Sequence, residues 1–272
     1  MDEATLREFK KLTTDQPELV GWTLPGLDQR TVILTGAGSG IGAAAARALT
    51  SAGARVLGVD RDAAGLEATT GSLDSDRMVT FVADLTEPAA PRQIVSAAIE
   101  AFGQFTTIVS LAGVSRWNLI PDVTREHFEF QIGVNVYAPF FLVQAALPQL
   151  RENGGQIVLC NSVTSAYLGS AGAIGYTTSK HAALGLMRVL AVELAPLGIR
   201  VNSISPGTTL SPINDSLFAV DGMAPMLAKK NPDSRIAEPH EHVGAIGYLI
   251  SDLAKHVYGH DLAIDGGRMA SS

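Results

Sequence analysis

The sequence predicts an α/β fold: a single doubly wound domain with a parallel seven-stranded sheet and helices on both faces. Short apolar runs rich in β-formers alternate with segments of helical spacing along most of the chain, and this alternation is typical of right-handed βαβ crossovers. The middle runs, such as VILT and RVLGV, are almost continuously apolar, as strands covered on both faces are. A glycine-rich turn directly follows the first of these runs.

Seven strands are expected in order along the chain. No change of composition marks a second domain, so residues 28–272 are expected to form a single domain and residues 1–27 a separate N-terminal arm. The arm could pack on the body, cross to a neighbouring subunit or be disordered. The predicted strands are Thr31–Thr35, Arg55–Val59, Val79–Ala83, Thr107–Leu111, Gln156–Cys160, Ile199–Ile204 and Leu262–Ile264.

The composition excludes several classes of protein. Only 17% of the residues are charged, against about 25% in an average soluble domain, so much of the surface is expected to be covered internally or by other subunits. A net charge of −7 without a basic cluster argues against nucleic acid as a partner. The single cysteine, Cys160, excludes an internal disulfide and a cysteine metal site, and a reducing cytoplasm is the simplest compartment.

One uncharged stretch, from Gln131 to Leu150, is long enough to raise the question of a membrane span. It contains an asparagine, two further glutamines and two prolines, so we interpret it as a buried or interface helix. The N-terminus mixes acidic and basic residues without the apolar core of a signal peptide. We therefore expect no membrane partner.

The glycine-rich turn TGAGSGIG, residues 35–42, is a candidate phosphate-binding loop. Gly36, Gly40 and Gly42, with Ser39 and Ile41 between them, lie where a strand must turn sharply and start a helix whose free N–H groups attract phosphate. A glycine-rich turn between a strand and a helix can also be only a turn.

Asp60 ends the second strand, 20 residues after Gly40, where a carboxylate can accept hydrogen bonds from the ribose hydroxyls of an adenosine. The same charge repels a 2′-phosphate, so NAD is favoured over NADP. Arg61 is the counter-argument, because an arginine near the ribose can bind that phosphate; its other interpretation is a solvent-facing loop charge.

The segment GYTTSKHAAL, residues 175–184, places Tyr176 and Lys180 four positions apart in a predicted helix, where such residues share one face. An ammonium beside a phenol stabilises the phenolate in a site shielded from water. The phenol can then accept the proton of an alcohol that gives up hydride, and return it in reverse. A boundary tyrosine beside a surface lysine is the alternative. His181 points away from the tyrosine and is expected at the surface or an interface.

Together these residues resemble the short-chain dehydrogenase/reductase family over about residues 28–268. The resemblance is carried by TGAGSGIG, Asp60, ADL at 83–85, Asn135, Ser162, YTTSK at 176–180, PG at 206–207 and IDGG at 264–267, which stand in the family's order and spacing. It implies a Rossmann-type fold and a dinucleotide cofactor.

The resemblance also implies a role for each matched residue. Tyr176 is the expected acid/base, Lys180 holds the nicotinamide ribose, and Ser162 hydrogen-bonds the substrate oxygen. Asn135 is expected to kink its helix and position a water. Asp84 resembles the acidic residue beside the adenine, although it could instead cap a helix. The expected cofactor contacts are Gly36, Ser39, Gly40, Ile41, Gly42, Asp60, Arg61, Asp84, Leu85, Ala112, Gly113, Tyr176, Lys180, Pro206, Gly207, Thr208 and Ser211.

Two positions depart from the family pattern. Leu111 stands where the family commonly has asparagine, so a side-chain hydrogen bond between central strands is expected to be lost. Asn161 precedes Ser162 where a second serine is common, and this change is expected to tune the site.

The substrate is expected to be a fairly apolar or cyclic secondary alcohol or ketone. The segment from Gly207 to Pro239 is too long for a plain connection and is either a substrate lid or a pair of helices packed on a neighbouring subunit. Its apolar side chains, with Trp117 from the loop after the fourth strand, are the candidate lining of a pocket. They are Leu210, Ile213, Leu217, Phe218, Met223, Met226 and Leu227.

The sequence therefore predicts an NAD(H)-dependent alcohol dehydrogenase or ketoreductase without a metal. An assembly of four chains, or of two, is expected because helices 131–150 and 176–195 are rich in small and apolar residues. The alternatives are an NADPH-dependent reductase of 3-oxoacyl thioesters and a regulator that binds the dinucleotide without chemistry.

Overall fold

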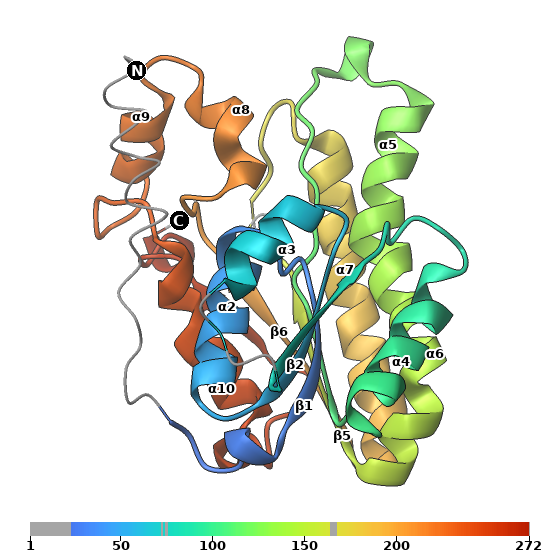
Figure 1. Cartoon of the computed structure of the whole chain (residues 1–272). Helices are drawn as coiled ribbons and strands as arrows, with labels where there is room; N and C mark the ends of the chain where they lie inside the picture. Colours follow the sequence, from blue (N-terminus) through green and yellow to red (C-terminus); the bar gives the residue numbers. More distant parts are fainter. Residues whose placement is uncertain (1–22, 72, 74–75, 164–167, 272) are drawn as a thin grey trace.

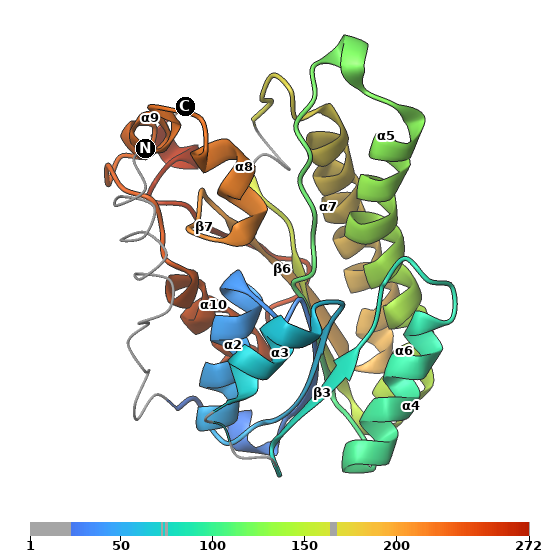
Figure 2. The same cartoon turned by 45° about the horizontal axis from the view of Figure 1, so that its top comes forward.

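The computed structural model describes residues 23–271 except 72, 74–75 and 164–167. A seven-stranded parallel sheet forms its middle layer, and helices cover both faces (Figures 1 and 2). The predicted fold class and all seven predicted strands are confirmed, with ends that differ by at most two residues. The strands are β1 (Thr31–Thr35), β2 (Arg55–Asp60), β3 (Met78–Val82), β4 (Thr107–Ser110), β5 (Gly155–Cys160), β6 (Ile199–Pro206) and β7 (Asp261–Ile264).

The strand order is β3-β2-β1-β4-β5-β6-β7. β1 pairs with β2 on one side and β4 on the other, and the direction of winding reverses between β1 and β4. Beyond the carboxyl ends of the strands at such a reversal the flanking loops diverge and leave a crevice, which is where open α/β sheets bind ligands.

Two apolar cores lie on opposite faces of the sheet, and alternate residues of β1 enter different ones. Ile33 packs in the core that α4, α6 and α7 cover. Val32 and Leu34 pack in the other core, beneath α2 and α10. This alternation explains why β1 has no polar face, as the continuous apolar run predicted.

The described part of residues 23–271 contains nine α-helices. They are α2 (Gly40–Ser51), α3 (Ala63–Thr70), α4 (Ala90–Phe102), α5 (Arg125–Ile132), α6 (Ala138–Asn153), α7 (Ile174–Leu194), α8 (Asp215–Phe218), α9 (Met223–Lys229) and α10 (Val243–Ile250). A π-helical turn, Gly133–Tyr137, joins α5 to α6 without a break.

The uncharged stretch 131–150 lies within this continuous helix. By length and composition alone the helix 125–153 is apolar enough to cross a membrane, a test that core helices of soluble proteins also pass. Here α6 packs on α4, α5 packs on α7, and Leu142, Ala146 and Leu150 are buried in a core. One face of the helix therefore packs in the core of the domain, as expected for a buried helix.

The structure describes the last residues of the predicted N-terminal arm and the whole of the long segment after β6. Residues 1–22 of the arm lie outside the described residues, whereas Leu27 is fully buried against the body. The segment 207–239 forms α8 and α9, which share a small apolar cluster of Leu210, Phe218 and Ala224. Both helices lie above the carboxyl edge of the sheet (Figure 1).

Candidate active site

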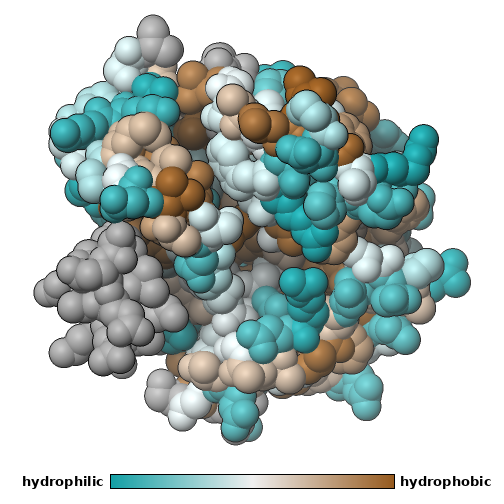
Figure 3. Space-filling model, turned by 90° about the horizontal axis from the view of Figure 1, so that it is seen from above, coloured by the Kyte–Doolittle hydropathy of each residue, from teal (hydrophilic) through white to brown (hydrophobic). Residues whose placement is uncertain are grey.

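A cavity of about 760 Å³ opens at the carboxyl edge of the sheet. Figure 3 views the molecule from this edge, where hydrophobic and hydrophilic residues are mixed. Loops after β1 through β6 contribute to the wall, together with α7 and α8. Every predicted cofactor residue lines this cavity, and so do Ser162, Tyr176 and Lys180. The side chain of Asn135 does not.

The loop between β1 and α2 has a conformation that requires glycine. Gly36 and Gly40 have φ angles of 79° and 51°, which other residues rarely adopt. A Cβ on Gly42 would stand 1.9 Å from the carbonyl oxygen of Gly36. Ser39 begins α2 without a side-chain cap, so the first N–H groups of the helix are available to an anion in the cavity.

Asp60 is fixed by backbone hydrogen bonds at the end of β2. Its Oδ2 accepts from Gly38 N–H at 2.9 Å and its Oδ1 from Asp62 N–H at 3.0 Å. Each oxygen keeps a lone pair for a further donor. The contribution of Gly38 was missed in the sequence, although the glycine lies in the quoted motif; a Cβ there would stand 3.0 Å from the Asp60 carboxyl group.

Asp84 lies two residues after the end of β3, an edge strand of the sheet. It does not cap α4, which begins at Ala90. Its Oδ1 accepts from the backbone N–H of Thr86 at 2.9 Å and from the Thr86 hydroxyl at 2.7 Å. These hydrogen bonds hold the pKa of Asp84 below its usual value. A negative charge therefore persists in this part of the cavity wall.

The floor of the cavity follows β4, where Leu111 replaces the expected asparagine. Leu111 packs against the apolar cluster under α2. The hydroxyl of Thr35 takes over part of the polar link, because it accepts from Ala112 N–H at 3.3 Å and lies 3.4 Å from the Ser110 hydroxyl. A side chain therefore still links the central strands β1 and β4, but it comes from β1 instead of from the position after β4.

Tyr176 and Lys180 lie in the first turns of α7 on the same side of the cavity. The Lys180 ammonium is 5.8 Å from the centre of the Tyr176 ring. Lys180 is buried, and its Nζ donates to the carbonyl oxygen of Cys160 at 2.7 Å. This carbonyl, at the end of β5, anchors the ammonium in a way that the sequence did not reveal. His181 is exposed, with Nδ1 2.8 Å from the Thr177 carbonyl, as expected for a surface residue.

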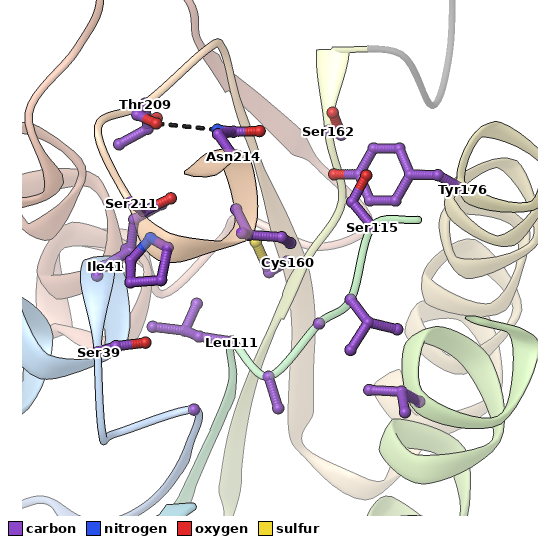
Figure 4. Close-up of a pocket in the computed structure, with 18 of the residues that line it drawn as sticks. Ser39, Ile41, Leu111, Ser115, Cys160, Ser162, Tyr176, Thr209, Ser211 and Asn214 are labelled. Carbon is purple, nitrogen blue, oxygen red and sulfur yellow. Dashed lines mark hydrogen bonds between the residues drawn. The ribbon is translucent and has the colours of Figure 1, made fainter. Parts of the chain in front are cut away.

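Three hydroxyl groups converge beside α7. Figure 4 shows Tyr176, Ser162 and Ser115 directed toward the same part of the cavity. Ser162 follows β5, and Ser115 lies in the loop after β4. Ser115 was missed in the sequence because nothing in its neighbourhood marks it as polar lining.

Asn135 lies inside the π-helical turn, and its amide holds the loop after β4. Its Oδ1 accepts from Val114 N–H at 2.9 Å, and its Nδ2 donates to the Val114 carbonyl and to the Ser179 hydroxyl, each at 2.9 Å. The side chain therefore connects the loop carrying Ser115 with α7. The expected distortion of the helix is present at this residue as the π-turn.

Asn161 directs its side chain away from the cavity centre into the sheet. Its Nδ2 donates to the Ser203 hydroxyl at 2.9 Å and to Asp261 at 3.3 Å. The hydroxyls of Ser203 and Ser205 also donate to Asp261, at 2.6 and 2.7 Å. Asn161 thus ties β5 to β6 and β7 beneath Ser162.

The loop after β6 forms another wall of the cavity, where the sequence predicted contacts with the nicotinamide. Ser211 lies close to the glycine-rich loop, 3.0 Å from where a Cβ of Gly40 would stand, and the Asn214 amide donates to the Thr209 carbonyl at 2.9 Å (Figure 4). Behind it, Nε2 of the buried His242 lies 2.9 Å from the Thr209 hydroxyl. Burial lowers the pKa of His242 to about 4, so its ring is neutral at pH 7.

The substrate end of the cavity is partly apolar. Trp117, Ile213, Leu217 and Leu227 line it, as expected. Leu210 and Phe218 instead pack inside the small cluster of α8 and α9, while Met223 and Met226 do not reach the cavity. The segment therefore forms both a cavity wall and a local core. Arg116, Phe130 and Asn214 are further lining residues that the sequence did not single out.

The described residues contain no group of three or more histidine, cysteine, aspartate or glutamate side chains arranged to hold a metal ion.

The chain is similar to known proteins over most of its length. A family model described as enoyl-(acyl carrier protein) reductase matches residues 36–268. The chain is 35% identical over 248 residues to L-rhamnose 1-dehydrogenase (NAD(P)(+)) of Azotobacter vinelandii, covering 89% of this chain and 97% of that one. It is 34% identical over 244 residues to D-threitol dehydrogenase of Mycolicibacterium smegmatis, covering 89% and 93%. The crystal structure of levodione reductase superposes with a TM-score of 0.82 at 30% identity, covering 89% and 98%.

Proposed function

Because the chain belongs to the short-chain dehydrogenase/reductase family, we propose a specific assignment of cofactor and catalytic roles within its cavity. The chain is an oxidoreductase that interconverts a secondary alcohol and a ketone with NAD(P). Within that activity we assign NAD(H) as the cofactor, Tyr176 as the acid/base and a fairly apolar or cyclic compound as the substrate. The observation that carries the assignment is the buried Lys180 ammonium beside the Tyr176 ring.

The residues at the carboxyl edge fit a dinucleotide. The uncapped start of α2 presents N–H groups to a phosphate, and the glycines that precede it leave room for close approach. Gly113 leaves space beside Lys180, since a Cβ there would stand 3.6 Å from Nζ. When bound, the nicotinamide supplies the chemistry of accepting a hydride from the carbinol carbon or returning it.

The chain's own part of the reaction is to move a proton. Tyr176 accepts the hydroxyl proton of the alcohol during oxidation and returns it to the carbonyl oxygen during reduction. Lys180 favours the phenolate by its positive charge, and its anchor on the Cys160 carbonyl keeps it one turn from the ring. Ser162 donates a hydrogen bond that orients the substrate oxygen toward Tyr176. Asn135 is assigned to position the loop after β4.

The preference for NAD rests on charge at the adenosine end. Three carboxylates line it, those of Asp60, Asp62 and Asp84, against the single guanidinium of Arg61. A 2′-phosphate placed there meets a net negative surface and loses solvation. Ribose hydroxyls instead find acceptors on Asp60, whose two oxygens are held in place by backbone donors.

We assign the active form to an assembly of four chains in the cytoplasm. Tyr137, Phe141, Val189 and Val192 are exposed on the outer faces of the α5–α6 helix and α7, and burying such residues between subunits is favourable. The proposal expects light scattering to give four chains per particle; a single chain per particle would contradict it.

The sharpest test of the catalytic assignment is Tyr176→Phe, which removes one oxygen and keeps the ring. We expect kcat to fall by about a hundredfold to ten-thousandfold, the usual contribution of a general acid or base, while NADH binding changes less than twofold. Reduced cofactor is followed by absorbance with a panel of secondary alcohols. Tyr248→Phe, on α10, is the matched control and should keep full activity. Unchanged turnover in Tyr176→Phe would remove Tyr176 from the chemistry.

The cofactor assignment is tested by Asp60→Ala. We expect the wild-type protein to bind NADH at least tenfold more tightly than NADPH, and the variant to lose most of that preference because the charge that repels the phosphate is gone. Fluorescence titration measures both dissociation constants. Tighter binding of NADPH by the wild-type protein would instead favour a reductase of 3-oxoacyl thioesters. Tight binding of either cofactor without turnover of any alcohol would favour a regulator.

A further inference from the structure

We propose that the substrate carries an anionic group, a carboxylate, which Arg116 and the indole of Trp117 bind at the substrate end of the cavity. The inference rests on the proposed function, because it places the carbinol at Tyr176 and asks what the rest of the substrate must offer. It concerns three consecutive residues of the loop after β4, Ser115, Arg116 and Trp117, all of which line the cavity.

The loop carries a cation in the wall of the cavity that also holds Tyr176. The hydroxyl of Ser115 points into the same part of the cavity as that of Tyr176 (Figure 4), and Arg116 is the next residue along the chain. Two main-chain anchors hold this loop in place. Asn135 bonds both backbone groups of Val114, and Gln131 Oε1 accepts from Arg116 N–H at 3.0 Å.

The guanidinium of Arg116 is oriented and has no ionic partner among the described residues. Its Cζ lies 4.2 Å from the centre of the Phe130 ring, a distance at which the planar group stacks on the aromatic face. Stacking occupies the face of the guanidinium and leaves its N–H donors directed outward in the plane. A fork of this kind matches a carboxylate with two parallel hydrogen bonds.

Trp117 adds a second donor that lacks an acceptor. Its Nε1 is buried, and no described residue accepts its hydrogen bond. An indole N–H is a donor only, and leaving it buried and unpaired has a cost that an oxygen of a bound substrate removes. Arg116 is exposed, so water satisfies its donors in the free protein. A group rich in acceptors and poor in hydrogens, such as a carboxylate, can bond both neighbouring donors in place of that water.

The remaining walls fix the rest of the substrate. Ile213 and Leu217 line the cavity from the segment after β6 and suit an apolar body. The substrate class is thus a hydroxy acid or keto acid with an apolar body.

Binding can be tested separately from turnover. The wild-type protein saturated with NAD in its oxidised form binds a ketone without reaction, because neither partner has a hydride to give. Calorimetric titration with levulinate and with cyclohexanone carboxylate is compared with titration of their methyl esters, which keep the shape and lose the charge. The same titrations are repeated for Arg116→Gln, Arg116→Lys and Trp117→Phe. Arg125→Gln is the matched control, since Arg125 is exposed on α5 and paired with Glu129 outside the cavity.

We expect at least one keto acid to bind about tenfold or more tightly than its ester, as a hydrogen-bonded charge pair predicts. Arg116→Gln should abolish this difference by weakening only the acid, whereas Arg116→Lys keeps part of it and Arg125→Gln all of it. Trp117→Phe should weaken the acid several-fold. The inference is overturned if esters bind as tightly as acids, if Arg116→Gln weakens both alike, or if no keto acid binds. Turnover of neutral secondary alcohols with NAD in any of these cases would leave the proposed function intact.

Discussion

The two ends of the cavity are built in different ways. At the cofactor end, backbone groups of the glycine-rich loop and the ends of β1 to β4 form the wall, and the key carboxylate of Asp60 is itself held by backbone N–H groups. At the substrate end, side chains from two segments, the loop after β4 and residues 207–239, form the wall and carry a small apolar core of their own.

This difference separates what is fixed from what can vary. A wall made of backbone depends on φ angles and on the absence of side chains, so its residues are constrained one by one. A wall made of side chains on a separately packed segment can change its lining while the sheet stays the same. The two ends of the cavity should therefore respond to mutation independently of each other.

The largest effect is expected for Gly42→Ala at the cofactor end. The new Cβ would stand 1.9 Å from the carbonyl oxygen of Gly36, so the loop must move and the start of α2 with it. We expect NADH binding to weaken by more than about a hundredfold, as a loss of several charged hydrogen bonds implies, together with a lower melting temperature. Fluorescence titration and thermal unfolding measure the two effects.

Gly244→Ala is the matched control for this change. Gly244 lies in α10, and a Cβ there meets no atom within 4 Å. Alanine should leave cofactor binding unchanged and raise the free energy of unfolding by up to about 1 kcal/mol. Equal losses in the two variants would show that the glycine-rich loop is not specially constrained.

A second prediction concerns His242, which supports the start of the segment 207–239 through Thr209. Burial lowers the pKa of His242 in the folded chain from 6.5 to about 4, so between these values the unfolded chain binds the additional proton. Stability should therefore be complete above pH 6.5 and fall as the pH falls toward 4, by about 3 kcal/mol in total. Urea unfolding between pH 7 and pH 4 measures it.

His242→Leu isolates this contribution from those of the carboxyl groups. Between pH 6.5 and 4, the free energy of unfolding of the variant should depend on pH less steeply than that of the wild-type protein, by the contribution of about one proton. Its binding of NADH at pH 7 should change less than its stability. His256→Leu provides the comparison with a histidine that is exposed. A pH profile that is the same in His242→Leu and the wild-type protein would exclude His242 as its source.

The smallest effect is expected for Leu217→Ala at the substrate end. Removing this part of the cavity wall should raise KM for a secondary alcohol by about tenfold, the usual value of a few methylene groups in an apolar pocket, while NADH binding stays within twofold. Met226→Ala is the control, because Met226 is exposed on α9 and does not reach the cavity. A matching change in NADH binding would show that the two ends are coupled.

Most of the cofactor end could be predicted from the sequence, for a physical reason. A strand that turns sharply into a helix needs glycine at particular positions, and a carboxylate at a strand end has a fixed place relative to that turn. Gly36, Gly40, Gly42 and Asp60 line the cavity for this reason. The spacing of four residues between Tyr176 and Lys180 likewise predicted that both lie on the same face of their helix.

The substrate end could not be predicted to the same extent. Arg116 owes its position to Phe130 and Gln131 on α5, and His242 meets Thr209 across 33 residues of chain. Such contacts depend on how segments that are distant in sequence pack together, and no periodic pattern of residues in the sequence indicates them. The compensation of Leu111 by Thr35 is of the same kind, because it comes from a neighbouring strand.

The π-turn at Gly133–Tyr137 makes the long helix sensitive to its exact length. A π-turn holds one residue more than an α-helical turn, so deleting one residue here would convert the turn to regular α-helix and change the directions in which its remaining side chains point. The side-chain amide of Asn135 would then lose the position from which it bonds both backbone groups of Val114. Single-residue insertions and deletions, rather than substitutions, are therefore the changes that this part of the chain should tolerate least.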